Sequence, residues 1–429
     1  MSVSQQIPVA DVVFRKDLYP RFTPDAATIQ RYQESLDVLP PIEINQRYEL
    51  IDGYHRWNAH KEAGRAEVPA TITETESDDA LLALAIERNA AHGLQLSQDD
   101  KRKMAIRLFT SRQRSEDDLA KLLSVSSKSV QRWLGDIKKA AREEQKATVA
   151  DMWLACYTQQ EIADAVELDQ KTVSNWTQEI GNLDNSPNFL KVAAMYQDAD
   201  WSPPLYNVWT WNKDDDTAVD HFGNSHSGIV DRLLYLYTNP FDVVVDPFAG
   251  AGSTVDICRK RTRRYWCADR KVKAGLETQK HIRTRDIVQG PPSYLPWSDV
   301  RLLYLDPPYW RQAQGQYSDD TSDLANMEID VFYDVLTDYV RTTAKKMVTG
   351  SHNAILIQPT QWKNEPTRDV VDHVVDLCKR LDGGSLRLKQ RISCPYTSQQ
   401  ANPQMVEWAK ANKQLLVLSR ELIVFEVAS

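Results

Sequence analysis

Short apolar runs that end in polar turns recur through the second half of the chain. Four of them are apolar enough to predict strands: 241–246, 265–268, 303–305 and 354–358. The run at 303–305 shows no polar alternation, which favours a strand buried on both faces of a parallel sheet. Helices are predicted near 324–348 and 367–382, a strand near 386–393, a short helix from Pro403, and a closing pair of strands at 414–418 and 421–427.

A different pattern fills residues 8–75, where short β-type runs alternate with helix-like ones. One strand ends at Asp52-Gly53, and a helix then begins with His55 and Arg56 in its first turn. Such a helix start presents N–H groups and two basic side chains, which together can cradle a phosphate. Gly53, His55 and Arg56 are therefore candidate nucleotide-phosphate residues.

Two helix-turn-helix patterns follow in tandem, at 117–134 and 158–176. In the first, apolar residues recur at a spacing that packs two helices around a turn: Leu119, Ala120, Leu123, Val125, Val130, Trp133 and Leu134. The second helix of each pair would project polar side chains, and a DNA major groove could receive them. The predicted DNA-binding residues are Lys128, Ser129, Arg132, Lys171 and Asn175. The alternative is an αα-hairpin of a helical bundle.

Length and linkers divide the chain into three predicted parts. The chain of 429 residues can hold about two to three domains, each with its own core. The polar stretch 181–187 is the best linker. We predict an α/β protein: a small α+β domain at 1–97, an all-α helix-turn-helix region at 98–185, and a Rossmann-like domain at 195–429. Residues 1–185 are called the N-terminal arm below.

Charge and cysteine usage narrow the classes of partner. The net charge is −8, yet thirteen Lys/Arg face six Asp/Glu at 101–150, and eleven face two at 259–285. Each basic island either contacts nucleic acid or forms a solvated helix face. Five scattered cysteines indicate free thiols and no metal site. No apolar run approaches the ~20 residues of a membrane helix, so a cytosolic protein without membrane contact is predicted.

The candidate chemistry is concentrated at Asp306-Pro307-Pro308-Tyr309, directly after a predicted buried strand. Two prolines fix φ and remove backbone donors, so the chain leaves the strand in a stiff corner. Asp306 and the Pro307 carbonyl can accept hydrogen bonds from an exocyclic NH₂, and Tyr309 offers a ring for stacking an extruded base. Trp310 is a candidate second wall for that base. A strand that ends in a Pro-rich turn is the alternative.

A glycine-containing turn lies upstream, from Asp246 to Gly252, between an apolar strand and a helix start. Its glycines let the backbone approach a ligand at the carboxyl end of a strand, where open α/β sheets bind cofactors. The next strand ends at Asp269, about 20 residues after the turn, where an acid can hold both hydroxyls of a ribose. This spacing suits an adenosine ligand.

Together these motifs resemble the S-adenosylmethionine-dependent DNA amino-methyltransferases, which modify adenine N6 or cytosine N4. The resemblance implies S-adenosyl-L-methionine as the cofactor and a Rossmann-like methyltransferase sheet. The implied cofactor-binding residues are Asp246, Phe248, Gly250, Gly252 and Asp269, and the implied catalytic residues are Asp306, Pro307, Pro308 and Tyr309. A looser match at 209–234 is similar to an extra helix beside the cofactor. The acid that the family tends to carry after its third strand is not expected, because 287–290 runs into two prolines.

The first segment of the chain resembles the ParB-like N-terminal domain, whose Gly-x-x-Arg turn binds nucleotide phosphates in partition proteins and in sulfiredoxin. Gly53-Tyr-His-Arg56 matches that turn. The second phosphate motif of partition proteins corresponds to 87–92, where His92 replaces an arginine, and Tyr54 stands in place of the sulfiredoxin cysteine. Because histidine is only partly charged near neutral pH, nucleotide binding competes with a role as scaffold or DNA clamp.

The resulting hypothesis is a DNA methyltransferase that acts on the amine of a flipped base, with adenine N6 favoured over cytosine N4. The rival is a ParB-like partition or regulatory DNA-binding protein, nucleotide-dependent or a nuclease, with a vestigial methyltransferase domain. Expected partners are double-stranded DNA, a nucleotide at the ParB-like domain and a second copy in a homodimer. Nearly every residue after Tyr309 is used by the predicted sheet and helices, which leaves no room for a large recognition domain, so sequence choice is assigned to 311–323, to 394–400 and to the N-terminal arm.

Overall fold

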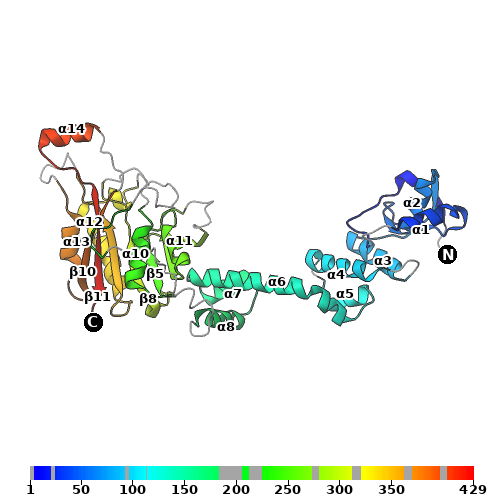
Figure 1. Ribbon diagram of the computed structural model, residues 1–429, viewed down its shortest axis with the longest axis horizontal. Helices are drawn as coiled ribbons and strands as arrows, with labels where there is room; N and C mark the ends of the chain where they lie inside the picture. Colours follow the sequence, from blue (N-terminus) through cyan, green and yellow to red (C-terminus); the bar gives the residue numbers. More distant parts are fainter. Residues whose placement is uncertain are drawn as a thin grey trace. The chain divides into compact units, whose positions relative to one another are not determined.

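The computed structural model describes residues 4–20, 25–91, 96–112, 114–182, 205–211, 225–272, 280–311, 320–361, 370–396 and 403–429. The chain forms two compact units, Met1–Glu144 and Gln145–Ser429, coloured from blue to red along the sequence in Figure 1. Helix α6 (Ser127–Leu154) contributes residues to both units. Within the described ranges, no helix has the length and apolar character needed to cross a membrane.

A small mixed sheet opens the first unit. Its strands lie in the order β1 (Gln5–Pro8), β4 (Glu67–Ile72), β2 (Ile42–Ile44) and β3 (Leu50–Asp52). Strand β4 is antiparallel to β1 and parallel to β2, while β2 and β3 are antiparallel. The accompanying helices are α1 (Ala26–Gln33), α2 (Tyr54–Glu62) and α3 (Asp78–Ala91), with 3-10 turns at Val9–Asp11 and Leu36–Val38. The predicted α+β domain is confirmed.

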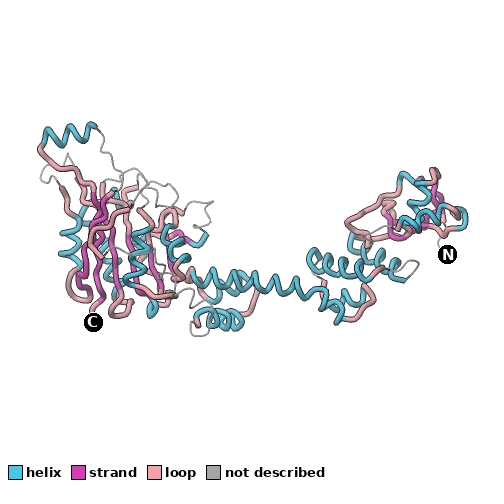
Figure 2. The backbone as a smooth tube through the Cα atoms, in the orientation of Figure 1, coloured by secondary structure: helices cyan, strands magenta, loops and turns pink. Residues whose placement is uncertain are grey.

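Helices alone make up the chain from α4 to α8, drawn in cyan in Figure 2. They are α4 (Gln98–Arg112), α5 (Glu116–Leu122), α6, α7 (Gln159–Val166) and α8 (Gln170–Gly181). Both predicted helix pairs are present, α5 with α6 and α7 with α8. Leu119, Leu123, Val130 and Leu134 are fully buried in the first pair, so the apolar spacing located its core.

A seven-stranded sheet forms the core of the second unit, in the order β10-β11-β9-β8-β5-β6-β7. The strands are β5 (Val243–Asp246), β6 (Arg264–Asp269), β7 (Ile282–Thr284), β8 (Val300–Leu305), β9 (His352–Ile357), β10 (Leu386–Pro395) and β11 (Ser419–Val427). Neighbours from β7 to β9 are parallel, whereas β11 is antiparallel to both β9 and β10. The predicted Rossmann-like α/β architecture is confirmed.

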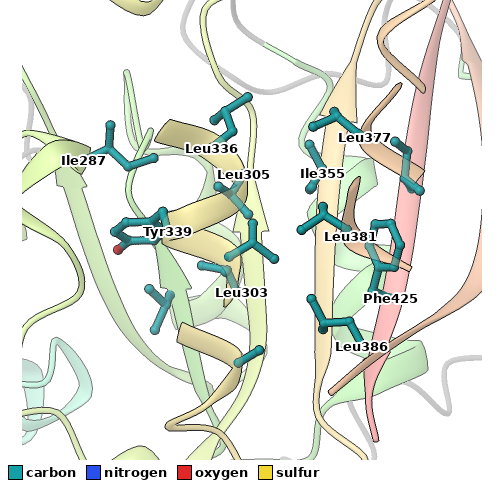
Figure 3. Packing of buried hydrophobic residues seen from close by; sticks show 14 of the residues in the cluster. Ile287, Leu303, Leu305, Leu336, Tyr339, Ile355, Leu377, Leu381, Leu386 and Phe425 are labelled. Carbon is teal, nitrogen blue, oxygen red and sulfur yellow. The ribbon is translucent and has the colours of Figure 1, made fainter. Parts of the chain in front are cut away.

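Helices cover both faces of this sheet, because its central strands are apolar on both sides. The helices are α10 (Gly228–Tyr237), α11 (Ser253–Lys260), α12 (Ile329–Ala344) and α13 (His373–Leu381). A further helix, α14 (Pro403–Asn412), follows β10 and precedes β11 along the chain. Figure 3 shows one face, where strand residues such as Leu303 and Ile355 meet Leu336 of α12 and Leu377 of α13. On the other face, Val244 and Leu302 pack in a cluster with α10 and α11.

The closing strands differ from the prediction. Residues 414–418 form no strand, and β11 is one continuous strand whose antiparallel partner is β10. The apolar run at 414–418 is instead held by a side chain. Gln361 donates to the Leu415 carbonyl at 2.7 Å and accepts from the Val417 N–H at 3.3 Å. Arg420, expected to separate two strands, therefore lies within β11, opposite Cys394.

The end of α6 and the turn after it belong to the second unit. Asp151 pairs with Arg259 at the end of α11 and lies 2.8 Å from the imidazole of His281, just before β7. Arg283 of β7 donates to the Cys156 carbonyl at 3.3 Å, and the Cys156 side chain is buried in the core beside the sheet. These contacts attach the end of α6, on which the α7–α8 pair packs, to the amino ends of the strands.

The second unit thus begins within α6, ahead of the predicted start at residue 195. A fragment of residues 195–429 would lack Ala155 and Cys156, which pack on opposite faces of the sheet. Removing buried residues leaves cavities that destabilise the remaining core. The full chain is therefore the form in which activity has to be measured.

Candidate active site

Three aspartates lie along one edge of the large sheet, each at the carboxyl end of a strand. Strand β5 ends at Asp246, β6 ends at Asp269, and Asp306 directly follows β8. Because β5 is parallel to both β6 and β8, the carboxyl ends of the three strands lie side by side. The predicted cofactor turn and the predicted catalytic corner are therefore neighbours in the fold.

Asp246 shapes the turn that follows β5. Its Oδ1 accepts from the Phe248 N–H at 2.8 Å, and its Oδ2 accepts from the Thr254 hydroxyl at 2.6 Å. Burial raises the pKa of Asp246 to about 7, although these two hydrogen bonds oppose the rise. Both oxygens of Asp246 thus fix the turn to the start of α11.

The glycines of the turn leave space for a ligand. Gly250 (φ +50°) and Gly252 (φ +97°) adopt the left-handed conformation, which glycine reaches without strain. Among the described residues, a Cβ at Gly250 would come within 4.0 Å of the Phe248 carbonyl oxygen alone. Asp269 accepts from the Gly250 N–H at 2.9 Å, so the turn and the acid form one continuous edge. Their chemistry fits an adenosine ligand, with the acid at the ribose and the backbone close to the rest.

Asp306 begins the corner 306–309. The Tyr309 hydroxyl donates to its Oδ1 at 3.2 Å, and the Ser225 hydroxyl donates to its Oδ2. Burial raises the pKa of Asp306 to about 6, while Ser225, Arg420 and Tyr309 oppose the rise. Near neutral pH the carboxylate is ionised and can only accept hydrogen bonds. This matches the NH₂ donor that the sequence predicted as its target.

Ser225 and Arg420 are components of this edge that the sequence did not reveal. Arg420 donates through Nη1 to the Ser225 Oγ at 2.8 Å, and both side chains are buried. The guanidinium also lies over the Tyr396 ring, 4.4 Å from its centre. Ser225 precedes α10 and Arg420 lies in the last strand, so the fold alone brings them together. No local motif marks either residue.

Trp310 is not the second wall of a base pocket. Its side chain is only 3% exposed and packs in the core formed with α12 and α13. The indole N–H donates to the Met327 carbonyl at 2.8 Å. Burying a large ring whose N–H has a hydrogen-bond partner is favourable. The indole of Trp310 is therefore more stable in the core than exposed beside Tyr309. The prediction for Trp310 is wrong.

An acid does follow the third strand of the sheet. Strand β7 ends at Thr284, and Asp286 lies two residues beyond it. Its side chain accepts from the Val288 N–H at 3.1 Å and caps a 3-10 turn, Ile287–Gln289. The expectation that this acid is missing is wrong, because the apolar pair Ile287-Val288 belongs to the turn rather than to the strand.

The second basic island, 259–285, is used within the protein. All seven of its arginines donate to protein groups, and these contacts bind helices, strands and loops of the second unit to one another. Arg259 donates to Asp151, Arg261 to Asp231, Arg263 to Thr238, Arg264 to Asp299, Arg270 to Asp320, Arg283 to Cys156 and Arg285 to Gly290. The helices α4 to α8 of the N-terminal arm are thus better candidates for nucleic-acid contact.

The predicted DNA-binding side chains lie on the second helix of each pair. Lys128 and Arg132 of α6 are exposed, as are Lys171 and Asn175 of α8. Ser129 is half-buried and closes the first turn of α6, where its hydroxyl lies 3.0 Å from that of Ser126. Four of the five side chains are thus open to a partner.

The ParB-like turn has the predicted strand and helix, but its basic groups have partners. A Cβ at Gly53 (φ +99°) would lie 2.8 Å from the Ile42 side chain, so glycine is required there. The buried His55 ring accepts through Nε2 from the Asp25 N–H at 3.0 Å. Arg56 pairs with Asp52 at 2.8 Å. A phosphate would have to compete with these contacts.

Several predicted segments lie partly outside the described residues. They are 209–234, 311–323, 394–400 and His92. Within the described ranges, no three His, Cys, Asp or Glu side chains gather where a metal ion could bind.

Two family models match successive parts of the chain. A family model described as DNA methylase matches residues 94–279, and a model of the ParB N-terminal domain matches residues 5–90. The chain is thus similar to a ParB N-terminal domain over residues 5–90 and to a DNA methylase over residues 94–279. The methylase match spans both helix pairs and the cofactor turn, and it ends before the corner 306–309. The two sequence resemblances are thereby confirmed.

Several solved structures are similar to parts of the chain. ParB of Caulobacter crescentus, complexed with CTP-gamma-S, is 23% identical over 31% of this chain and 77% of that one, with a TM-score of 0.20. TrmN of Thermus thermophilus is 16% identical over 47% and 49%, with a TM-score of 0.31. The 1,6-didemethyltoxoflavin-N1-methyltransferase of Burkholderia thailandensis, with bound S-adenosylhomocysteine, is 11% identical over 47% and 76%, with a TM-score of 0.28. No curated protein matches the chain.

Proposed function

We propose that this protein methylates the exocyclic amine of a base in DNA, with adenine N6 favoured over cytosine N4. The observation that carries the proposal is the meeting of Asp306, Asp269 and the glycine turn at one edge of the sheet. A vestigial domain would have no need to keep these groups together. The choice of adenine follows the resemblance, since Asp at the head of this motif goes more often with adenine.

Each group at the edge has a role in this proposal. S-adenosyl-L-methionine, when bound, supplies an electrophilic methyl group, and Asp269 with the backbone of Gly250 and Gly252 would hold it. Asp306 accepts a hydrogen bond from the target amine, which raises the electron density on its nitrogen, and can hold the proton that the amine releases. Tyr309 offers its ring to the flipped base while its hydroxyl orients Asp306.

The full chain provides the test. It would be incubated with double-stranded DNA of random sequence and methyl-labelled S-adenosyl-L-methionine, and nucleosides from the digested DNA would be identified by mass spectrometry. We expect labelled N6-methyladenine, whereas N4-methylcytosine would keep the enzyme and correct the base. Cofactor binding by calorimetry without any labelled nucleoside would favour the rival, a DNA-binding protein with a vestigial domain.

For the choice of DNA sequence we propose the second helix pair, α7–α8. It packs on the end of α6, and Asp151 of α6 pairs with Arg259 and His281 of the second unit. A reader that is rigidly attached to the catalytic unit can set which base reaches Asp306. Lys128 and Arg132 belong to the first part of α6, which lies in the unit of the ParB-like domain, so the proposed role of the α5–α6 pair is to hold the DNA backbone.

Paired substitutions separate the two roles. Lys171→Ala with Asn175→Ala is expected to change the sequence context of methylated bases, because lost base contacts cost about 1–3 kcal/mol of discrimination. Lys128→Ala with Arg132→Ala is expected to weaken DNA binding uniformly and to reduce its salt dependence. Sequencing of methylated sites in a random DNA library measures the sequence context, and a mobility shift at several salt concentrations measures the binding. The assignment fails if only the α6 variant changes the sequence context.

Nucleotide binding at Gly53, His55 and Arg56 and the homodimer both stay predictions. The partners of His55 and Arg56 within the domain make a role of the ParB-like fold as a DNA clamp the stronger proposal.

A further inference from the structure

Arg420 is a buried cation at the edge that holds Asp306. Arg420 is only 6% exposed to solvent. It meets Asp306 through the Ser225 hydroxyl rather than as a direct ion pair. Placing a charge in the protein interior costs several kcal/mol unless the surroundings compensate. The carboxylate on the far side of one hydroxyl is such compensation, and it ties the cation to the candidate catalytic group.

The directions of these hydrogen bonds follow from the chemistry of the three groups. A guanidinium has donors and no acceptor, so the Ser225 Oγ must accept from Arg420. The single hydrogen of Ser225 is then directed to the Asp306 Oδ2. The Tyr309 hydroxyl donates to Oδ1 in the same way. Every neighbour in this network presents a hydrogen to Asp306, which favours a carboxylate over a carboxylic acid.

We infer that Arg420 is a positioning residue that, through Ser225, keeps Asp306 ionised and oriented to accept the target amine. The inference rests on the proposed function and adds to it a residue outside the family motifs. It explains why the half-buried carboxylate of Asp306 can remain charged at neutral pH. Without the cation, only the hydrogen bonds from Ser225 and Tyr309 would oppose the burial that disfavours the charged form of Asp306.

The other ionisable groups around Asp306 come from four strands and two loops. They are Asp246 of β5, Tyr304 of β8, Tyr309, Cys394 of β10, Tyr396 and Arg420 of β11. Arg420 alone carries a positive charge in this described set. Burial holds the pKa of Tyr304 and Tyr309 well above the usual value, so neither competes with Asp306 for charge near neutral pH.

The test compares kcat of the Arg420→Met variant with kcat of the wild type, both as full-length proteins, over pH 5 to 9. We expect the acidic limb of kcat to move upward by at least one pH unit. Such a move lowers kcat about fivefold at pH 6 and restores it at pH 9. Ser225→Ala should move the limb in the same direction, and Arg420→Lys should restore part of it. Arg391→Met is the matched control, because Arg391 lies on neighbouring β10 with an exposed side chain.

A second measurement does not depend on activity. NMR titration of carboxyl-labelled aspartate, with Asp306 assigned from Asp306→Asn, follows ionisation of Asp306 directly in wild type and in Arg420→Met. An upward move of its titration supports the inference. An unchanged titration, or a loss of kcat that is equal at every pH, overturns it. A wild-type protein that methylates no DNA would instead contradict the proposed function, and the titration would still decide the role of Arg420.

Discussion

Asp306→Ala is expected to lower the rate of methyl transfer by at least about 10²–10³-fold, the usual effect of removing a preorganised group that acts on the reacting centre. The corner loses the acceptor that holds the target amine, while the glycine turn and Asp269 are untouched. Cofactor binding by calorimetry and DNA binding by a mobility shift should stay near their wild-type values. Asp338→Ala is the control, because Asp338 is an exposed aspartate of α12 in the same unit.

Asp306→Asn refines this result. The amide retains one acceptor oxygen and cannot ionise, so a reduced activity should remain without an acidic limb. In wild type, the pKa of Asp306 near 6 predicts that activity falls as pH drops through this value, because protonation removes the carboxylate. Wild-type turnover retained by Asp306→Ala would rule out the proposed chemistry. An identical acidic limb in Asp306→Asn would assign that limb to another group.

Arg261→Met is expected to destabilise the second unit by about 3–5 kcal/mol, the cost of leaving one charge of a buried pair without its partner. Arg261 binds Asp231 with two hydrogen bonds of 2.7 Å, and the two side chains are 7% and 11% exposed. The pair joins α10 to the end of α11. Since α10 follows Ser225 and α11 follows Gly252, the loss should also weaken cofactor binding.

Calorimetric unfolding of the full chain measures this effect on the transition of the second unit. Arg380→Met is the matched control, because Arg380 pairs with Asp330 and Asp334 at the surface, where such pairs contribute at most about 1 kcal/mol. Combining Arg261→Met with Asp231→Leu should recover much of the lost stability. If Arg261→Met costs no more than Arg380→Met, the buried pair does not stabilise the unit.

The sequence could predict the parts of the site that depend on residues close together along the chain. Asp246, Asp269 and Asp306 each end or follow an apolar strand, and parallel strands place their carboxyl ends together. The helix pairs were equally visible, because the spacing of residues such as Leu119 and Val130 is a local property. Such features need no knowledge of which distant segments touch.

What escaped prediction depends on contacts between distant segments. Arg420 and Ser225 meet only because β11 joins the sheet next to β9, and a lone arginine carries no signal of burial. Trp310 follows Tyr309 directly, yet its orientation depends on the core that α12 and α13 build. The arginines of 259–285 resemble a nucleic-acid surface until their partners, such as Asp231 and Asp299, are known.

The attachment of α7–α8 at the amino ends of the strands bears on the shape of the DNA target. The anchor residue His281 precedes β7, whereas Asp306 follows β8 at the opposite end of the sheet. Strand β6, six residues long, spans about 20 Å at about 3.3 Å per residue. This length equals about six base pairs at about 3.4 Å each. Under the proposed function, the bases that α8 would contact should therefore lie to one side of the methylated base, giving an asymmetric target with a long footprint.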